Sequence, residues 1–130
     1  MKWSILICTI GQRNDRFATL LDTLLPQIKG KDIEIVAYWN NAELPLSDIR
    51  QALVENARGE YISFIDDDDA VPDYYCEEIY KLLDGVDYIG FRLQVWHNGE
   101  KLKPTFHSLR YDRWSEDSKG YYRNISHLNP

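Results

Sequence analysis

The feature that most constrains the fold is a run of mostly apolar residues near the N-terminus, Trp3 to Thr9, with the sequence WSILICT. Polar and apolar residues do not alternate along it, which is typical of a strand covered on both faces in a parallel sheet. Parallel strands are joined by long crossover connections, usually helices. This run therefore favours an α/β fold.

The segment after this strand has helical spacing. Its apolar residues, from Phe17 to Ile28, are placed so that they form one stripe along a helix. Asn14 is a suitable N-terminal cap, and Pro26 is expected to kink or end the last turn before Gly30. We therefore predict a helix that buries one stripe directly after the first strand.

Further strands and helices alternate along the chain up to about residue 90. The pattern predicts a strand from Ile33 to Tyr38 or Trp39, a helix over 48–58 capped by Ser47 and stopped by Gly59, a strand over 61–65, a helix from Pro72 to about Leu83 stopped by Gly85, and a strand from Tyr88. The resulting order, β-α-β-α-β-α-β, implies a mostly parallel sheet flanked by helices.

Residues 92–130 have a different pattern. Asn98-Gly99, between two extended segments, is a signal for a type I′ hairpin, and beyond Pro104 we expect irregular chain with one strand at about Tyr121 to Ile125. A chain of 130 residues is long enough for one core. We therefore predict a single domain, with an α/β part over residues 1–91 and a hairpin with an irregular segment over residues 92–130.

Charge is distributed unevenly along the chain. Residues 1–91 carry 8 Lys and Arg against 17 Asp and Glu, a balance of -9, and residues 92–130 carry 7 against 4, a balance of +3. The acidic part would repel a polyanion, so we do not expect nucleic acid as a partner. The basic segment, residues 92–130, could still bind phosphate groups.

The sequence also indicates the compartment. The apolar runs are shorter than the roughly 18 residues that cross a bilayer, so no transmembrane segment is expected. Cys8 and Cys76 both lie in apolar segments and are expected to be reduced packing residues. A cytoplasmic location fits these features.

Four consecutive carboxylates, Asp66 to Asp69, follow the strand predicted over residues 61–65. At an effective dielectric constant near 20 each close pair of them repels by roughly 3 kcal/mol. A hard divalent cation with oxygen ligands would offset that repulsion. The alternative is a solvated acidic turn at the start of the next helix, where the helix dipole favours negative charge.

Three loops are expected to meet at one edge of the sheet. In an open α/β sheet ligands bind beyond the carboxyl ends of the strands, and residues 9–13, 40–41 and 66–69 all follow such ends. Gly11 is isolated, so neither a P-loop nor a dinucleotide-binding fingerprint is present. Nucleotide phosphates at this edge would have to be held through a metal.

Residues 1 to about 90 resemble the nucleotide-sugar-binding half of a family 2 glycosyltransferase with the GT-A fold. The likeness rests on a strand ending in Thr9, a polar loop with Arg13, a Leu-rich helix ending in Pro-Gln, Arg50, and the segment ARGEYISFIDDDD over residues 57–69. It implies a Rossmann-like nucleotide-diphospho-sugar transferase fold, here with a C-terminal β-hairpin.

The resemblance also implies roles for the acidic residues. The D-x-D motif of the family corresponds to Asp66 and Asp68, with Asp68 as the ligand of a Mn²⁺ or Mg²⁺ ion that bridges the diphosphate of the donor. Asp67 would lie near the ribose. The expected cofactor is therefore Mn²⁺ or Mg²⁺.

Other positions correspond to residues that hold the base of the donor in the family. These are Thr9, Arg13 and Arg50, together with the position of Asn40. Family members usually have Asp-Asp or Asp-Asn after the second strand, and this chain has Asn40-Asn41. A carboxylate contact to the base therefore becomes an amide contact.

The implied reaction is transfer of a sugar from a nucleotide-diphospho-sugar, with a UDP-sugar as the expected donor, to the hydroxyl of a glycan or other acceptor, with inversion. In the family a downstream carboxylate is the general base, and residues 127–130, HLNP, resemble a motif that precedes it in some relatives. The chain stops there, apparently without the acceptor and base segment. Asp117, in the pair Glu116-Asp117, is the candidate base, and a charged surface loop is the alternative for it.

Two other functions stay open. The first is a truncated or degenerate module that binds a nucleotide or divalent ion without transferring sugar and is completed by a partner chain or by self-association. The second is a nucleotidyltransferase, which also uses paired aspartates on an α/β sheet. The absence of a glycine-rich phosphate loop argues against this second alternative.

Overall fold

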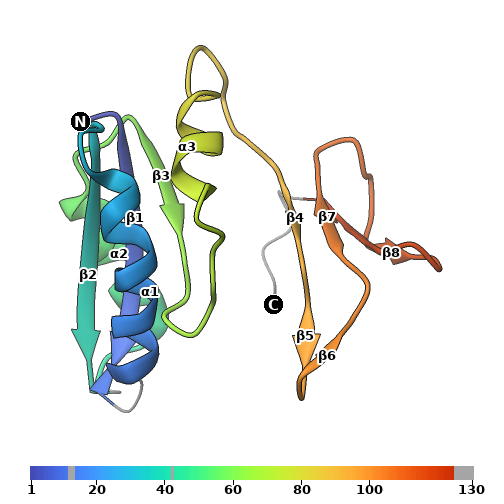
Figure 1. Ribbon diagram of the computed structural model, residues 1–130, viewed down its shortest axis with the longest axis horizontal. Coiled ribbons are helices and arrows are strands. Elements are labelled where there is room, and N and C mark those ends of the chain that lie inside the picture. The colour runs from blue at the N-terminus through green and yellow to red at the C-terminus, as the bar shows by residue number, and fades with distance from the viewer. Residues whose placement is uncertain (12–13, 42, 125–130) are drawn as a thin grey trace. The chain divides into compact units, whose positions relative to one another are not determined.

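The computed structural model describes residues 1–11, 14–41 and 43–124 of the chain. The chain divides into two compact units, Met1–Asp84 and Gly85–Pro130, which we call unit 1 and unit 2. Figure 1 labels their helices and strands. The sequence analysis divides the chain after residue 91, whereas unit 2 begins at Gly85.

Unit 1 contains a parallel sheet of three strands, β1 (Trp3–Ile10), β2 (Ile33–Asn40) and β3 (Tyr61–Phe64), in the order β2-β1-β3. Trp3 is in register with Ile33 on one side and with Tyr61 on the other. The central position of β1 explains its apolar sequence, because both its edges are paired and both its faces are covered. The prediction of a parallel sheet is confirmed for these three strands.

Three helices accompany the sheet: α1 (Asn14–Ile28), α2 (Leu46–Asn56) and α3 (Tyr75–Tyr80). Ile49 and Leu53 of α2 form a buried cluster with Leu6 of β1. Trp3 points to the opposite face from Leu6, and its ring centroid lies 5.8 Å from that of Tyr75 in α3. Figure 1 shows α1 and α2 on opposite sides of the sheet. Helices thus lie on both faces of the three-stranded sheet.

The ends of α2 differ from the prediction. Pro45, not Ser47, occupies the cap position, and no side chain caps the helix. Gly59 is absent from the residues with positive φ, and the helix already ends in extended backbone at Ala57. Gly59 is needed for another reason: a Cβ there would lie 2.6 Å from the backbone nitrogen of Ser4. Gly85 has the positive φ that a left-handed stop needs, +69°, but it does not end the third helix. That helix spans Tyr75–Tyr80, not Pro72 to about Leu83 as predicted.

The predicted fourth parallel strand, from Tyr88, is wrong. The parallel sheet has three strands within the described chain, and β4 (Arg92–Leu93) instead pairs antiparallel with β7 (Thr105–His107) in unit 2. A Cβ at Gly90 would lie 2.6 Å from the carbonyl oxygen of His107. The glycine therefore lets this segment lie against the backbone of its own unit.

Unit 2 is built of short strands. The Asn-Gly hairpin is confirmed: β5 (Trp96–His97) pairs with β6 (Glu100–Lys101), and Asn98 and Gly99 have φ of 50° and 80°, as a type I′ turn requires. A second sheet has the order β4-β7-β9-β8, with β8 at Ser115–Glu116 and β9 at Tyr121–Arg123. The strand expected near Tyr121 is therefore also confirmed.

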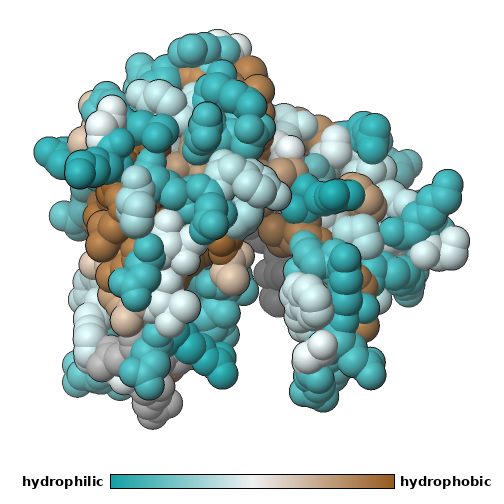
Figure 2. Space-filling view, in the orientation of Figure 1, coloured by the Kyte–Doolittle hydropathy of each residue, from teal (hydrophilic) through white to brown (hydrophobic). Residues whose placement is uncertain are grey.

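The hydrophobic core lies in unit 1. Among the described residues, every buried hydrophobic side chain belongs to Met1–Asp84, the last being Leu83. Cys8 packs against the α2 cluster, and burial raises the pKa of Cys76 to about 11. Neither cysteine forms a disulfide. Figure 2 shows a mostly hydrophilic face with hydrophobic residues in smaller patches.

None of the described helices combines the length and the apolar composition that crossing a membrane requires.

Candidate functional site

One edge of unit 1 brings together the carboxyl ends of β1 and β2 and the turn formed by Asp66 to Asp69, which we call the acidic turn. Ile10 is in register with Asn40, the last residue of β2. Ile65 donates its N–H to the carbonyl of Leu6 at 3.0 Å, which extends the pairing of β3 with β1 beyond Phe64. Ile10 then donates its N–H to Oδ2 of Asp67 at 3.4 Å. The sheet therefore brings together residues that are 57 positions apart.

Residues 66–69 form a tight turn in which the N–H of Asp69 donates to the carbonyl of Asp66 at 3.0 Å. The turn separates the four carboxylates. Asp67 is buried, with 1% of its surface exposed, whereas the Asp68 side chain is 33% exposed and Asp66 and Asp69 are exposed. One carboxylate thus anchors the turn to β1, and the others remain accessible.

The electrostatics of the turn reflect this crowding. Desolvation raises the pKa of Asp69, and the negative charges of Asp66, Asp68 and Asp67 raise it further. Arg16 of α1 opposes this charge, with Nη1 at 3.7 Å from Oδ2 of Asp68. The turn is therefore a region of concentrated negative charge that is partly compensated from α1.

A cavity of about 320 Å³ lies between the first half of α1 and the acidic turn. Its lining combines charged and small side chains: Asp15, Arg16, Thr19, Leu20, Thr23, Asp68, Asp69 and Ala70. The hydroxyls of the two threonines donate to backbone carbonyls of α1. Arg16, Asp68 and Asp69 thus bring charged groups to the border of the cavity.

Thr9 and Asn40 lie at the same edge but differ in their contacts. Thr9 is 1% exposed, and within the described part of the chain its Oγ1 has no hydrogen-bond partner. Such a buried hydroxyl costs about 1–3 kcal/mol, which a hydrogen bond to a ligand would remove. The amide of Asn40, in contrast, donates to the carbonyl of Leu44 at 3.1 Å and accepts its N–H at 3.4 Å. Asn40 thus holds the loop between β2 and α2.

Trp39 adds an aromatic surface to the edge. Its indole N–H donates to Oδ1 of Asn41 at 3.0 Å, and half of the residue is exposed. A Cβ at Gly11 would approach Asn41 and the indole ring to 3.1 and 3.3 Å. A larger residue at position 11 would therefore push against the tryptophan.

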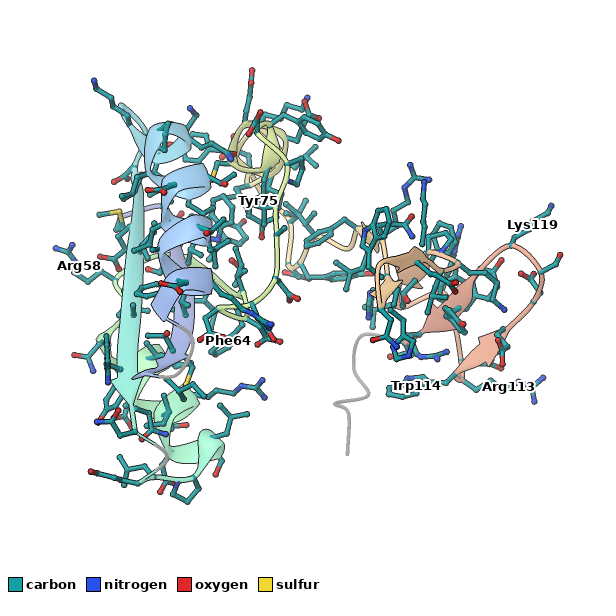
Figure 3. All side chains as sticks on the ribbon, turned by 60° about the horizontal axis from the view of Figure 1, so that its bottom comes forward. Arg58, Phe64, Tyr75, Arg113, Trp114 and Lys119 are labelled. Carbon is teal, nitrogen blue, oxygen red and sulfur yellow. The ribbon has the colours of Figure 1, made fainter. Side chains whose placement is uncertain are left out.

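Arg50 lies beside the strand that leads into the acidic turn. Its Cζ is 5.8 Å from the centroid of the Phe64 ring, at the end of β3. Figure 3 labels Phe64 and, at the edge formed by β2, Arg58. Arg13, the other basic residue expected to bind the donor, lies outside the described residues, as do residues 127–130.

The family to which this arrangement belongs is decided by a sequence comparison. The model of glycosyl transferase family 2 matches residues 11–129, which is most of the chain and includes both units. This chain is a member of glycosyl transferase family 2. The resemblance to this family is therefore confirmed, over a match that begins at residue 11 and extends well beyond residue 90. No curated protein and no solved structure matches the chain.

Family 2 membership has general consequences for function. It supports a role in glycosyl transfer, with a nucleotide-sugar as donor and a separate acceptor. It also agrees with the α/β architecture of unit 1. The acidic turn after β3 is then the natural place to test for binding of a cation.

The carboxylates of the acidic turn are suited to a cation that is held jointly by the protein and by the phosphates of a bound substrate. No group of three or more metal-binding side chains occurs within the described residues. Mg²⁺ is, however, commonly held by one or two carboxylates together with substrate phosphates and water. The accessible carboxylates of Asp66 and Asp68 meet this requirement.

Asp117 lies in unit 2, in a turn that it helps to hold. Its Oδ1 accepts the N–H groups of Lys119 and Gly120 at 2.8 and 3.1 Å and the hydroxyl of Tyr122 at 3.0 Å. The Lys119 N–H contributes most to lowering the pKa of Asp117. These bonds favour the ionised carboxylate and make it a weaker base. Its assignment as the general base stays a prediction.

Sequence reasoning missed Arg16. Of the two arginines that follow β1, Arg13 and Arg16, the resemblance assigns only Arg13 to the donor. Arg16 is in the first turn of α1, directly after β1, so its helical position already placed it near the carboxyl edge. What was missing was its partner, Asp68, which only the folded sheet brings near.

Proposed function

We propose that this family 2 member transfers a sugar from a nucleotide-diphospho-sugar, with UDP-sugars as the first donors to test, to an acceptor hydroxyl. The observation that carries the proposal is the contact between Ile10 and Asp67. It anchors the acidic turn to the end of β1, at the edge where α/β sheets bind ligands. Asp66 and Asp68 remain accessible on either side of this anchor.

Asp66 and Asp68 would hold a Mn²⁺ or Mg²⁺ ion together with the diphosphate. Such an ion stabilises the negative charge that develops on the leaving diphosphate. The residues of the chain supply position: Asp67 holds the turn to β1 and is proposed to lie near the ribose. Thr9 and Arg50 are proposed to contact the base, beside the loop that Asn40 holds. The buried Oγ1 of Thr9 has no partner among the described residues, which supports its role as a contact to the donor.

Inverting transfer also needs a base that takes the proton of the acceptor hydroxyl. Asp117 is the proposed base. Its three hydrogen bonds favour a second candidate function, a module that binds nucleotide and cation without transferring sugar, completed by a partner chain or a second copy. We propose the cytoplasm as the site of either function.

Calorimetry with UDP, in the presence and absence of Mn²⁺, tests the site. We expect metal-dependent binding by the parent chain and a loss of at least about tenfold in Asp68→Asn, because one charged ligand is removed. Asp73→Asn is the matched control, since Asp73 is an exposed carboxylate outside the acidic turn. Arg50→Ala should weaken binding with or without metal.

The two candidate functions are then separated by activity. Release of UDP from a UDP-sugar, accelerated by an acceptor, supports transfer, whereas binding without release supports the module. If the parent chain does not bind UDP under either condition, or if Asp68→Asn binds as well as the parent, the proposed site is wrong.

A further inference from the structure

Arg16 has an unusual place in unit 1. It is in the first turn of α1, its side chain is 68% exposed, and its Nη1 lies 3.7 Å from Oδ2 of Asp68. That distance is within the range of an ion pair but too long for a hydrogen bond. The guanidinium therefore compensates the charge of the acidic turn without being fixed to it.

The pair between Arg58 and Glu34 shows how a permanent ion pair is built in the same unit. The guanidinium of Arg58 donates to Oε2 of Glu34 through Nε at 2.9 Å and through Nη2 at 2.7 Å. The Glu34 side chain is only 12% exposed, and its Oε1 also accepts the hydroxyl of Ser4. The contact of Arg16 with Asp68 has neither this fork geometry nor this burial.

Arg16 also borders the cavity described above. Arg16 and Asp68 both line the space of about 320 Å³ between α1 and the acidic turn. The planar guanidinium matches the oxygens of a phosphate group, which it binds more strongly than an exposed carboxylate at a loose distance. Phosphate that enters beside Asp68 would therefore compete for Arg16.

We infer that Arg16 is an exchangeable counter-ion, which neutralises Asp68 in the unliganded chain and moves to the diphosphate when a divalent cation takes its place at Asp68. This inference rests on the proposed function of the acidic turn. It makes Arg16 a positioning residue with two opposite effects. It competes with a cation that binds alone, and it assists a diphosphate that binds together with the cation.

Arg16→Gln separates these effects. Binding of Mn²⁺ alone, followed by electron paramagnetic resonance, should become about two- to fivefold tighter, because a competing surface charge is removed. Binding of UDP at saturating Mn²⁺, followed by calorimetry, should become about tenfold weaker, because a charge-assisted hydrogen bond is lost. Arg16→Lys keeps the charge but not the fork, so it should bind Mn²⁺ like the parent and UDP with intermediate affinity.

Lys81→Gln is the control for net charge. Lys81 pairs with Glu78 in an exposed contact in and just after α3 and does not line the cavity. The substitution Lys81→Gln removes one positive charge, as Arg16→Gln does, and should leave the affinities for Mn²⁺ and for UDP unchanged. Thermal unfolding of each variant checks that the chain remains folded.

The outcomes are distinct. Opposite changes in Arg16→Gln, absent from the control, support the inference. Unchanged affinities, or changes in the same direction for Mn²⁺ and UDP, overturn the inference and leave the proposed site intact. Absence of UDP binding by the parent chain at saturating Mn²⁺ overturns the proposed function, and the inference with it.

Discussion

Units 1 and 2 are held together in different ways. Unit 1 has strands of up to eight residues around a buried core, whereas the strands of unit 2 have two or three residues. Among the described residues, buried hydrophobic side chains belong only to unit 1. Hydrophobic burial is the main stabilising contribution in most folds. The acidic turn therefore belongs to the unit that hydrophobic burial stabilises more.

Unit 2 depends on contacts between basic and aromatic side chains. Arg123 lies 4.8 Å above the ring of Trp114, Lys103 lies 4.5 Å above that of Tyr121, and the rings of Phe106 and Tyr122 stack at 5.5 Å. Figure 3 labels Trp114 among these side chains. Because none of the described hydrophobic side chains of unit 2 is buried, unit 2 is expected to open more readily than unit 1.

The comparison is tested most strongly by removing a buried side chain from unit 1. Leu6→Ala should lower the free energy of unfolding by about 2–5 kcal/mol, because Leu6 is fully buried against α2. Leu109→Ala, at a position in unit 2 that is 51% exposed, makes the same chemical change. It should have an effect of about 0.5 kcal/mol or less. Urea unfolding measures both, and equal losses would contradict the contrast between the units.

The second test of the comparison between the units is the pH dependence of the stability of unit 1. The Ser4 hydroxyl, at 2.6 Å, and then the groups of Arg58 lower the pKa of Glu34 to about 2 from its usual 4.5. Because the pKa is lowered on folding, the stabilisation is present above pH 4.5 and is lost as the pH falls toward 2. Glu34→Gln should therefore cost about 1–2 kcal/mol at neutral pH and progressively less in acid.

Glu60→Gln is the control for this pH series. Glu60 pairs with Lys2 but its side chain is 68% exposed, so its loss should change stability little at any pH. Urea midpoints of the parent and both variants between pH 7 and pH 3 provide the measurement. A difference between parent and Glu34→Gln that grows toward acid would show the sign to be wrong.

The smallest effect is expected in unit 2, from Asp117→Ala. Loss of the carboxylate frees the N–H groups of Lys119 and Gly120, so hydrogen exchange at these two amides should become several-fold faster. Amides of β1 should exchange as in the parent. If Asp117 is also the base, turnover falls while UDP binding is kept, and unchanged turnover would leave it with a structural role alone.

Much of the fold could be predicted from local pattern. The apolar run at Trp3 to Thr9 identified the central strand, and Asn98-Gly99 identified the type I′ hairpin, because both features act through neighbouring residues. The predicted strand from Tyr88 was wrong because pairing, not propensity, decides which sheet a short strand joins. Gly59 was expected to end a helix, and its role instead depends on the approach of Ser4.

The candidate site also combines features that could be predicted from the sequence with features that could not. The sequence by itself determined the family, through its likeness to the family pattern. It also determined the position of the acidic residues after β3 and the α/β order of the elements, which follow from spacing along the chain. Only the tertiary structure decided that Asp67 is buried against Ile10, that Arg16 faces Asp68 and that the Asn40 amide is occupied by Leu44. Burial and the distance between charges depend on how distant segments pack, and periodicity in a sequence does not contain that information.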